Sequence, residues 1–327
     1  MRFVLRRVGF FVITLWAAIS LNFFLPRLMP GNPALAMMAQ YKGHINGQAL
    51  KALEIAFGVN DHQSLISAYF QYFGNIFTGN FGVSIVFQMR SVSYEVLQAL
   101  PWTLGLVGVT TVLAFILGTL VGLVAGWRRG GKLDSWLPPV FVVTSAFPYF
   151  WVGLVAVWLF AYKLGWFPEN GGYSTNDQIG LNFHFIGDML EHSILPAFTL
   201  LLTAIGGWIL TMRNTVITVL AEDYVRMARA KGLKPWTVMW GYAGRNAILP
   251  NLTGFAMSLG FVVSGAILVE YVFNYPGVGW MLLDAVSEED YALMQALFLL
   301  ITVSVLLAVL ASDVLTAIGD PRTRERG

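Results

Sequence analysis

The pattern that comes nearest to a chemical site is a glycine-rich segment that ends in a lysine. Gly126, Gly131 and Lys132 have the spacing G-x-x-x-x-G-K, which in nucleotide-binding proteins surrounds phosphate groups with backbone amides. The next position must then carry Ser or Thr to hold magnesium, but here it is Leu133. The segment also follows a long apolar stretch instead of a β-strand. We interpret it as a basic loop and expect ATP to be handled by a partner.

The remaining residues do not indicate metal or thiol chemistry. The chain contains no cysteine, which excludes disulfides, thiolate zinc ligands and thiol catalysis. Its histidines, which show no H-E-x-x-H or similar ligand spacing, are His44, His62, His184 and His192. We therefore expect no catalytic residue, no metal site and no cofactor in this chain.

Carboxylates near apolar segments raise the question of proton transport. Glu270 and Asp313 lie near the ends of predicted membrane helices, and no carboxylate lies in the middle of one. A proton relay needs an ionisable group within the bilayer. A structural or interfacial role for both residues is therefore the interpretation that we prefer.

The composition is that of a membrane protein. Of the 327 residues, 57% are hydrophobic and 12% are charged, whereas charged residues make up about 25% of a typical soluble protein. A hydrocarbon core of ~30 Å requires about 20 apolar residues per helix. Such blocks predict six transmembrane helices, at residues 8–25, 100–126, 137–161, 194–212, 248–269 and 291–312. The expected fold class is an all-α polytopic membrane protein, and the net charge of +2 gives no sign of a nucleic-acid partner.

The first block could also be a signal peptide, because Arg6 and Arg7 precede it. Its apolar stretch is longer than a usual signal core, and it ends in Leu25, Pro26 and Arg27 instead of a small-x-small cleavage site. We therefore expect a retained first helix.

The distribution of positive charge predicts the orientation of these helices. With the N-terminus in the cytoplasm, most of the 20 Lys and Arg residues fall on the cytoplasmic side, as the positive-inside rule requires. The exceptions are Arg27, Lys42, Lys51, Arg90 and Lys163. Both termini are therefore expected in the cytoplasm.

The predicted helices divide the chain into four parts. Residues 1–29 hold the N-terminus and the first helix, 30–99 an extracytoplasmic loop domain, 100–320 a five-helix transmembrane core, and 321–327 a cytoplasmic tail. Within the first outer loop, apolar residues at helical spacing predict a short amphipathic helix packed on the membrane domain. These residues are Leu65, Ile66, Tyr69, Phe70 and Phe73.

Glycines on the second predicted helix form a face for close helix packing. Gly118, Gly122 and Gly126 recur at every fourth position. The sequence leaves open whether this face packs within the subunit or against a partner.

The cytoplasmic loop at 213–247 is expected to hold two helices joined by a glycine corner. Glu222 and Asp223 suit a helix N-terminus, Gly232 suits its end, and Pro235 suits the start of a second helix. The residues expected to share one side of the first helix are Tyr224, Met227 and Ala228, and those expected to form a stripe on the second are Trp236, Trp240, Ala243 and Ala247. Physical reasoning leaves two interpretations open, a connector against lipid headgroups and a docking surface.

The residues of this loop resemble a known family. The segments EDYVRMARAKGL at 222–233 and RNAILP at 245–250 resemble the EAA loop of binding-protein-dependent importer permeases, specifically the dipeptide and oligopeptide subfamily. Arg226 in place of the usual Glu, and the long gap from Gly232 to Pro250, depart from the general consensus but are usual for this subfamily. Met227 replaces a Thr.

Further segments resemble the same subfamily along nearly the whole chain. They are MRFVLRR at 1–7, LMPGNPA at 28–34, GNFGVS at 79–84, VEYVFNYPGVG at 269–279 and DPRTR at 320–324. The long first outer loop is similar to that of the first, B-type, of the two permeases in such systems.

The resemblance implies a type I ABC importer permease fold in the plasma (inner) membrane. The chain would catalyse no reaction and would form half of a pathway for di- or oligopeptides, with oligosaccharides of the β-glucoside type or nickel as alternatives. The implied partners are a second homologous permease, two ATP-binding subunits that hold ATP and Mg, an extracytoplasmic substrate-binding protein and membrane lipid.

The resemblance also implies a coupling role for the loop. The expected ATPase-coupling residues are Tyr224, Arg226, Ala228, Arg229, Ala230, Gly232, Leu233 and Pro250. Residues 224–233 would form a coupling helix in a groove of the ATPase, with small residues allowing close approach and the two arginines reaching carboxylates. The residues that line the substrate pathway are not predicted.

Two other classes of protein would show different features. A secondary transporter would show an inverted repeat and charged or broken helices in mid-membrane. An intramembrane enzyme would need paired catalytic groups within its spans. The sequence indicates neither.

Overall fold

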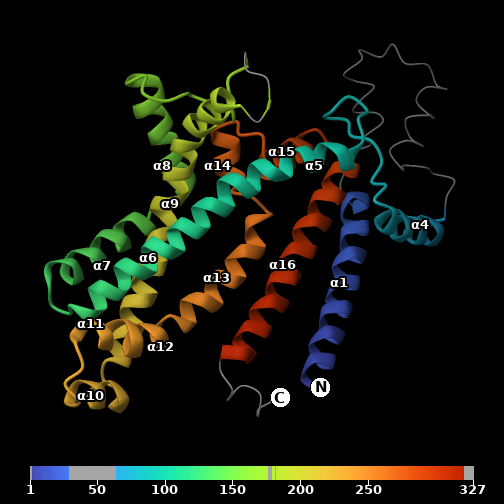
Figure 1. Ribbon diagram of the computed structural model, residues 1–327. Helices are drawn as coiled ribbons and strands as arrows, with labels where there is room; N and C mark the ends of the chain where they lie inside the picture. Colours follow the sequence, from blue (N-terminus) through green and yellow to red (C-terminus); the bar gives the residue numbers. More distant parts are fainter. Residues whose placement is uncertain (1, 29–63, 176–178, 181, 320–327) are drawn as a thin grey trace.

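A computed structural model describes residues 2–28, 64–175, 179–180 and 182–319 of the chain (Figure 1). Within these ranges the structure is helical apart from connecting turns and one antiparallel bridge between Val83 and Ser91. Four described segments are long and apolar enough to cross a membrane: Arg7–Leu25, Val92–Trp127, Phe183–Val219 and Tyr291–Asp313. Most of the predicted motif at 28–34 and all of that at 320–324 lie outside the described residues.

The first and last helices lie side by side and run in opposite directions. An ion pair joins Arg7 of α1 (Arg2–Leu28) to Asp313 of α16 (Tyr291–Gly319). Toward the other end of both helices, the Asn22 side-chain amide donates a hydrogen bond of 2.8 Å to the carbonyl of Gln295. The start of α1 and the end of α16 therefore lie at the same end of the molecule (Figure 1).

The second and fourth predicted helices form the most closely packed pair. One continuous segment consists of α5 (Val92–Thr103), a π-helical turn at Leu104–Gly108 and α6 (Val109–Trp127), and its glycine face contacts α9 (Phe183–Val219). A Cβ atom on Gly122 would come within 2.5 Å of the Ile209 carbonyl oxygen and 2.8 Å of the Met212 Cβ. The predicted glycine face therefore packs within the subunit.

The third and fifth predicted helices are interrupted, so the prediction of two unbroken helices is wrong. In place of the third lie α7 (Lys132–Ser145) and α8 (Tyr149–Ala156), followed by a π-helical segment at Val157–Lys163. Pro148 precedes α8 and ends the preceding helix, because proline has no N–H and disfavours helical geometry in the residue before it. In place of the fifth lie α13 (Leu249–Val262) and α14 (Ile267–Val272), separated at Gly265, whose φ is +71°.

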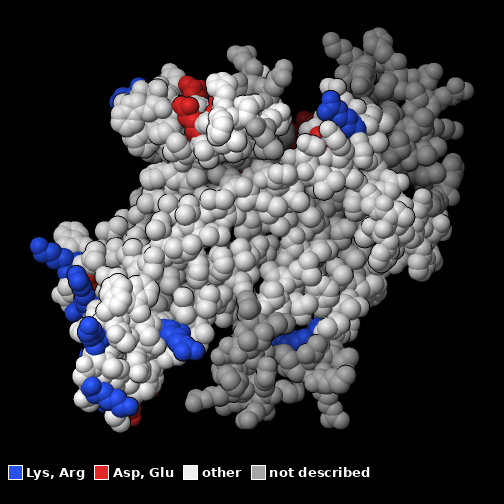
Figure 2. Space-filling model, viewed as in Figure 1, with Lys and Arg blue, Asp and Glu red and all other residues white. Residues whose placement is uncertain are grey.

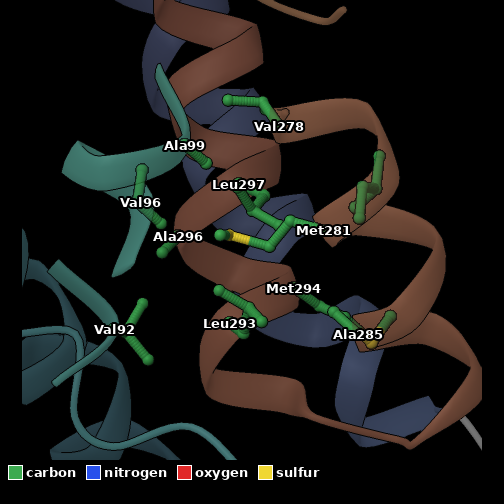
Figure 3. Packing of buried hydrophobic residues seen from close by; sticks show 11 residues of the cluster. Val92, Val96, Ala99, Val278, Met281, Ala285, Leu293, Met294, Ala296 and Leu297 are labelled. Carbon is green, nitrogen blue, oxygen red and sulfur yellow. The ribbon is translucent and has the colours of Figure 1, made fainter. Parts of the chain in front are cut away.

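A buried cluster joins α5, α15 (Val278–Ser287) and α16 (Figure 3). These helices meet at the end of the molecule opposite to the start of α1 (Figure 1). Its members are Val92, Val96, Ala99, Val278, Met281, Leu282, Ala285, Leu293, Met294, Ala296 and Leu297. This packing fixes the beginning of the last long helix against the beginning of the second one.

The short helix predicted in the first outer loop is confirmed as α4 (Leu65–Thr78). The Ser64 side chain caps its first turn by accepting from the Ser67 amide, and Gly79 ends it at φ +67°. It contacts α1 through two tyrosines. The Tyr69 hydroxyl lies 2.7 Å from the Ser20 hydroxyl, and the Tyr72 hydroxyl accepts from the Asn22 amide at 3.0 Å.

Candidate functional site

The loop that follows α9 contains the expected helix, glycine corner and second helical segment. The first helix is α10 (Asp223–Ala230), with Asp223 in its first turn, where a carboxylate favours the helix dipole. Gly232 turns the chain at φ +75°. Pro235 then opens α11 (Pro235–Thr237), which continues through a π-helical segment at Val238–Gly244 into α12 (Arg245–Ala247).

The buried face of α10 differs from the predicted one. Val225 and Ala228 are buried, and they form a cluster with Val238 of the second segment. Tyr224 and Met227, which were expected on the same side as Ala228, are exposed. Val225 and Ala228 are three residues apart and therefore share one side of α10. The helix is oriented with this side against the rest of the protein. In the second segment the predicted stripe is divided, because Ala243 and Ala247 are buried. The two tryptophans of the predicted stripe, Trp236 and Trp240, are exposed.

The last residue of α6 connects α10 to the transmembrane helices. The Arg229 guanidinium lies over the Trp127 ring, 5.1 Å from its centroid, which is a cation–π contact. Trp127 also packs against the buried cluster of α10, together with Val219 and Leu220 at the end of α9. The loop is therefore attached to both helices of the glycine-packed pair.

A hydrogen bond links the two separate parts of the loop motif. The Asn246 side-chain amide donates to the Tyr224 hydroxyl at 3.0 Å and to the Tyr242 carbonyl at 3.1 Å. Pro250 follows in the first turn of α13, where its missing N–H leaves no helical bond unmade. Residues 222–233 and 245–250, far apart in the loop, thus form one structural unit.

The outward face of the loop is exposed and basic. Its exposed residues include Tyr224, Arg226, Met227, Arg229, Ala230, Lys231 and Gly232. Arg226 lies 3.7 Å from Asp223, and both side chains face solvent, so this ion pair contributes little to stability. Figure 2 shows Lys and Arg side chains concentrated at this end of the molecule. Such a face is chemically suited to an acidic protein surface.

Of the residues predicted for coupling, two point inward instead. Ala228 is buried within the cluster of α10, and Leu233 packs against the same cluster. Trp127 and Asn246, which the sequence did not single out, are as closely tied to the loop as the predicted residues. Asn246 belongs to the RNAILP segment, so the family resemblance could have indicated it. Trp127 belongs to the imperfect nucleotide motif, which gives no indication of a contact with the loop.

A carboxylate just after the imperfect nucleotide motif forms a hydrogen bond with one of the backbone amides of the motif. Asp134 accepts a hydrogen bond from the Gly130 amide at 2.8 Å and another from the Arg213 Nε at 2.6 Å. These bonds, chiefly that from Arg213, hold the pKa of Asp134 below its usual range. The Gly130 amide, which a phosphate would need, already has a partner.

The sequence favoured a structural or interfacial role over proton transport, and the structure confirms the structural one for Glu270. Its side chain is fully buried and accepts hydrogen bonds from the Gly279 amide at 2.7 Å, the Trp280 amide at 3.3 Å and the Thr103 hydroxyl at 3.1 Å. A Cβ on Gly279 would lie 2.9 Å from the Glu270 carboxylate. The carboxylate therefore holds the start of α15 against α5. The segment VEYVFNYPGVG carries both the acid and two of the glycines beside it, Gly277 and Gly279.

An all-helical membrane protein with a basic helix–glycine–helix loop attached to paired transmembrane helices has the architecture of a transport permease. Residues 118–325 match the family described as binding-protein-dependent transport system inner membrane component, and the chain belongs to this family. It is thus a multi-pass inner-membrane protein.

Curated relatives match over almost the entire length. The di/tripeptide transport system permease protein DppB of Pseudomonas aeruginosa is 34% identical, covering 99% of each chain. The oligopeptide transport system permease protein AppB of Bacillus subtilis is 32% identical over 98% of each chain. The glutathione transport system permease protein GsiC of Escherichia coli K12 is 31% identical over 99% of each.

Proposed function

We propose that the chain is the first, B-type, permease of an ATP-driven importer for di- or oligopeptides, and that α10 couples it to a separate ATPase. The peptide substrate is supported by the relatives, whose names specify di/tripeptide, oligopeptide and glutathione transport. Oligosaccharides of the β-glucoside type and nickel are the alternative substrates.

The attachment of α10 to the glycine-packed pair α6–α9 is the observation that carries the coupling proposal. A force applied to α10 passes through the buried residues Val225 and Ala228 and the Arg229–Trp127 contact into both long helices. Because Gly122 lets those helices touch closely, they move together. The residues that face outward and are available for docking are Arg226, Ala230 and Gly232. Ala228 and Leu233 instead pack α10 against the rest of the chain.

The proposed topology has six membrane crossings, with the α7–α8 and α13–α14 pairs each making one broken crossing. It places both termini in the cytoplasm. This is supported by the position of α10, the start of α1 and the end of α16 at one end of the molecule (Figure 1). The basic side chains gathered at that end agree with the positive-inside rule (Figure 2).

The proposed complex also contains a second homologous permease, two ATP-binding subunits and an extracytoplasmic substrate-binding protein. ATP and Mg would bind to the ATP-binding subunits, and the chain itself would hold no cofactor and no catalytic residue. The hydrogen bond from the Gly130 amide to Asp134 supports this assignment, because it occupies the donor that a phosphate would require. Alternating access would then follow from two packed states of the permease pair.

The test is purification of the tagged chain from gently solubilised membranes, followed by reconstitution of whatever co-purifies. Recovery of a second permease, ATP-binding subunits and a binding protein, with ATP-dependent uptake of labelled dipeptides, is the expected result. ATP-dependent uptake of a β-glucoside or nickel instead of peptide would overturn the substrate. Uptake by this chain alone without ATP would overturn the coupling role.

A further inference from the structure

The surface of α4 is divided into three sectors with different surroundings. A helix advances ~100° per residue, so residues three and four apart share a side. The sector against α1 contains Ala68, Tyr69, Tyr72, Phe73 and Ile76, all partly buried. A second sector is exposed and apolar, and a third is exposed and polar. The apolar sector consists of Ile66, Phe70 and Phe77, and the polar one of Ser67, Gln71, Gly74 and Thr78. Leu65, the first residue of the helix, is also exposed but lies on the side of Tyr69 and Tyr72.

The side chains of the apolar sector are largely exposed. The exposed fraction is 73% for Ile66, 68% for Phe70 and 86% for Phe77. The helix LISAYFQYFGNIFT also contains no charged residue. Large apolar side chains grouped on one exposed face mark a surface that is covered by another phase or molecule.

The position of α4 on α1 defines the depth at which this face lies. Its contacts fall on Ser20, Asn22 and Phe23, and the apolar stretch of α1 ends at Leu25. With a rise of ~1.5 Å per residue, Ser20 lies about 8 Å inside the end of that stretch. Helices that lie in a membrane interface bury their apolar face by about 5–10 Å.

A charged side chain marks the membrane boundary at this level. The Arg27 guanidinium folds back over the Phe23 ring, 3.6 Å from its centroid, and donates to the Phe23 carbonyl at 2.7 Å. An arginine at the end of an apolar helix places its stem along apolar surface and its head among lipid headgroups. Phe23 itself contacts Tyr69 and Tyr72, so α4 lies directly beneath this arginine.

The apolar surface of α4 adjoins the exposed apolar surface of α1 through Tyr69, which contacts Phe70 of the apolar sector at a ring-centroid separation of 5.8 Å. Phe24, which is exposed on α1, stacks against Tyr69 with a centroid separation of 6.5 Å. Figure 1 shows α4 running crosswise to α1 beside the end of that helix. A helix with this orientation presents one side to the acyl chains and the opposite side to water.

We propose that α4 lies in the boundary between headgroups and acyl chains of one leaflet, with lipid in contact with Ile66, Phe70 and Phe77. In the topology proposed above, this is the outer leaflet. The inference depends on the chain being a membrane protein and not on the coupling role of α10.

The test uses single cysteines, which the chain permits because it has none of its own. Two pairs of adjacent residues compare the apolar sector with the polar one at nearly the same place: Phe70→Cys with Gln71→Cys, and Phe77→Cys with Thr78→Cys. Each variant carries a nitroxide label in vesicles of phosphatidylethanolamine and phosphatidylglycerol. The collision rates of the label with oxygen and with a water-soluble nickel chelate are then measured. Val12→Cys on the exposed side of α1 supplies the lipid reference.

At positions 70 and 77 we expect oxygen contact near that of position 12 and little contact with nickel, with the opposite order at 71 and 78. Strong nickel contact at all four positions would place α4 in water and overturn the proposal. Low contact with both reagents at 70 and 77 would show that protein covers the apolar sector, which would also overturn it. Elution of each variant at the wild-type size establishes that the labelled chain is folded. Lipid-like contact of the label at position 12 establishes that the chain is inserted in these vesicles.

Discussion

The Tyr224 hydroxyl accepts a hydrogen bond from the side-chain amide of Asn246, 22 residues further along the chain. This contact joins α10 to the segment that leads into α13, so a displacement of α10 reaches a third long segment besides α6 and α9. We expect Tyr224→Phe to reduce uptake by the reconstituted importer, while ATP hydrolysis continues. The lost bond is worth about 0.5–1.5 kcal/mol of unfolding free energy.

A double-mutant cycle separates this bond from the general effect of each residue. Tyr224→Phe, Asn246→Ala and the double variant are compared by thermal unfolding in detergent. If the bond is formed, the double variant loses less than the sum of the single losses. Additive losses would count against it.

The close contact of α6 with α9 is expected to be sensitive to a single methyl group. Gly122→Ala places a Cβ against the Ile209 carbonyl and Met212, so the helices must separate. Overpacking of this kind costs about 1–3 kcal/mol. Gly105→Ala is the matched control on the same continuous segment, because nothing lies within 4 Å of its new Cβ. The unfolding temperature of the purified chain should fall for the first variant and not for the second.

Gly232 has a backbone conformation that favours glycine, and the chain itself leaves room for a side chain there. Its φ is +75°, while no atom lies within 4 Å of an added Cβ. A β-branched residue is strongly disfavoured at positive φ, whereas Asn adopts it more readily. We therefore predict that Gly232→Val abolishes ATP-coupled uptake without preventing membrane insertion, and that Gly232→Asn retains most of the uptake. Equal loss in both variants would point to docking contacts instead.

Removal of the buried Glu270 carboxylate should destabilise the end of the molecule that holds α15. In Glu270→Ala the amides of Gly279 and Trp280 lose their acceptor. A buried donor left without its acceptor costs about 1–3 kcal/mol. Glu169→Ala, an exposed glutamate, serves as the control. Thermal unfolding should show a clear loss for the first variant only; an unchanged midpoint would refute the structural role.

The Asp134–Arg213 pair predicts a defined dependence of stability on pH. The pKa of Asp134 is lowered in the folded protein, so its contribution is fully present above the ordinary value of about 3.9 and is lost as the pH falls through the folded value. Between pH 5 and 8 the carboxylate is ionised in both the folded and the unfolded chain, so its contribution to stability should stay constant. Wild type and Asp134→Asn should differ in unfolding temperature at pH 7 and converge in acid. A constant difference at all pH values would contradict this.

The sequence predicted the helical class and the approximate position of the transmembrane segments, because long apolar blocks leave few alternatives in a bilayer. It failed where an apolar block contains a break. Pro148 and Gly265 interrupt helices whose apolar composition continues on both sides, and hydropathy does not register a change of backbone direction. The fourth predicted helix extends far beyond its apolar centre, since polar residues at both ends of α9 remain helical.

In the loop, the corner at Gly232 and the start at Pro235 were predictable from local backbone preferences. The buried face of α10 was not. Whether Tyr224 or Val225 turns inward depends on what lies beneath, and Trp127 comes from a segment almost a hundred residues away in the chain. The environment of Glu270 was equally inaccessible, because Thr103 reaches it from another helix.

The surroundings of Glu270 constrain how this segment can vary. The Glu270 carboxylate occupies space that is free only because three neighbouring positions lack a side chain, namely Gly265, Gly277 and Gly279. A Cβ atom at any of them would collide with the carboxylate and displace it. Loss of the acid in turn leaves backbone amides without an acceptor. A substitution of Glu270 or of one of these glycines can therefore preserve stability only if a second of the four positions changes as well. We expect related chains to replace these residues together or to keep all of them.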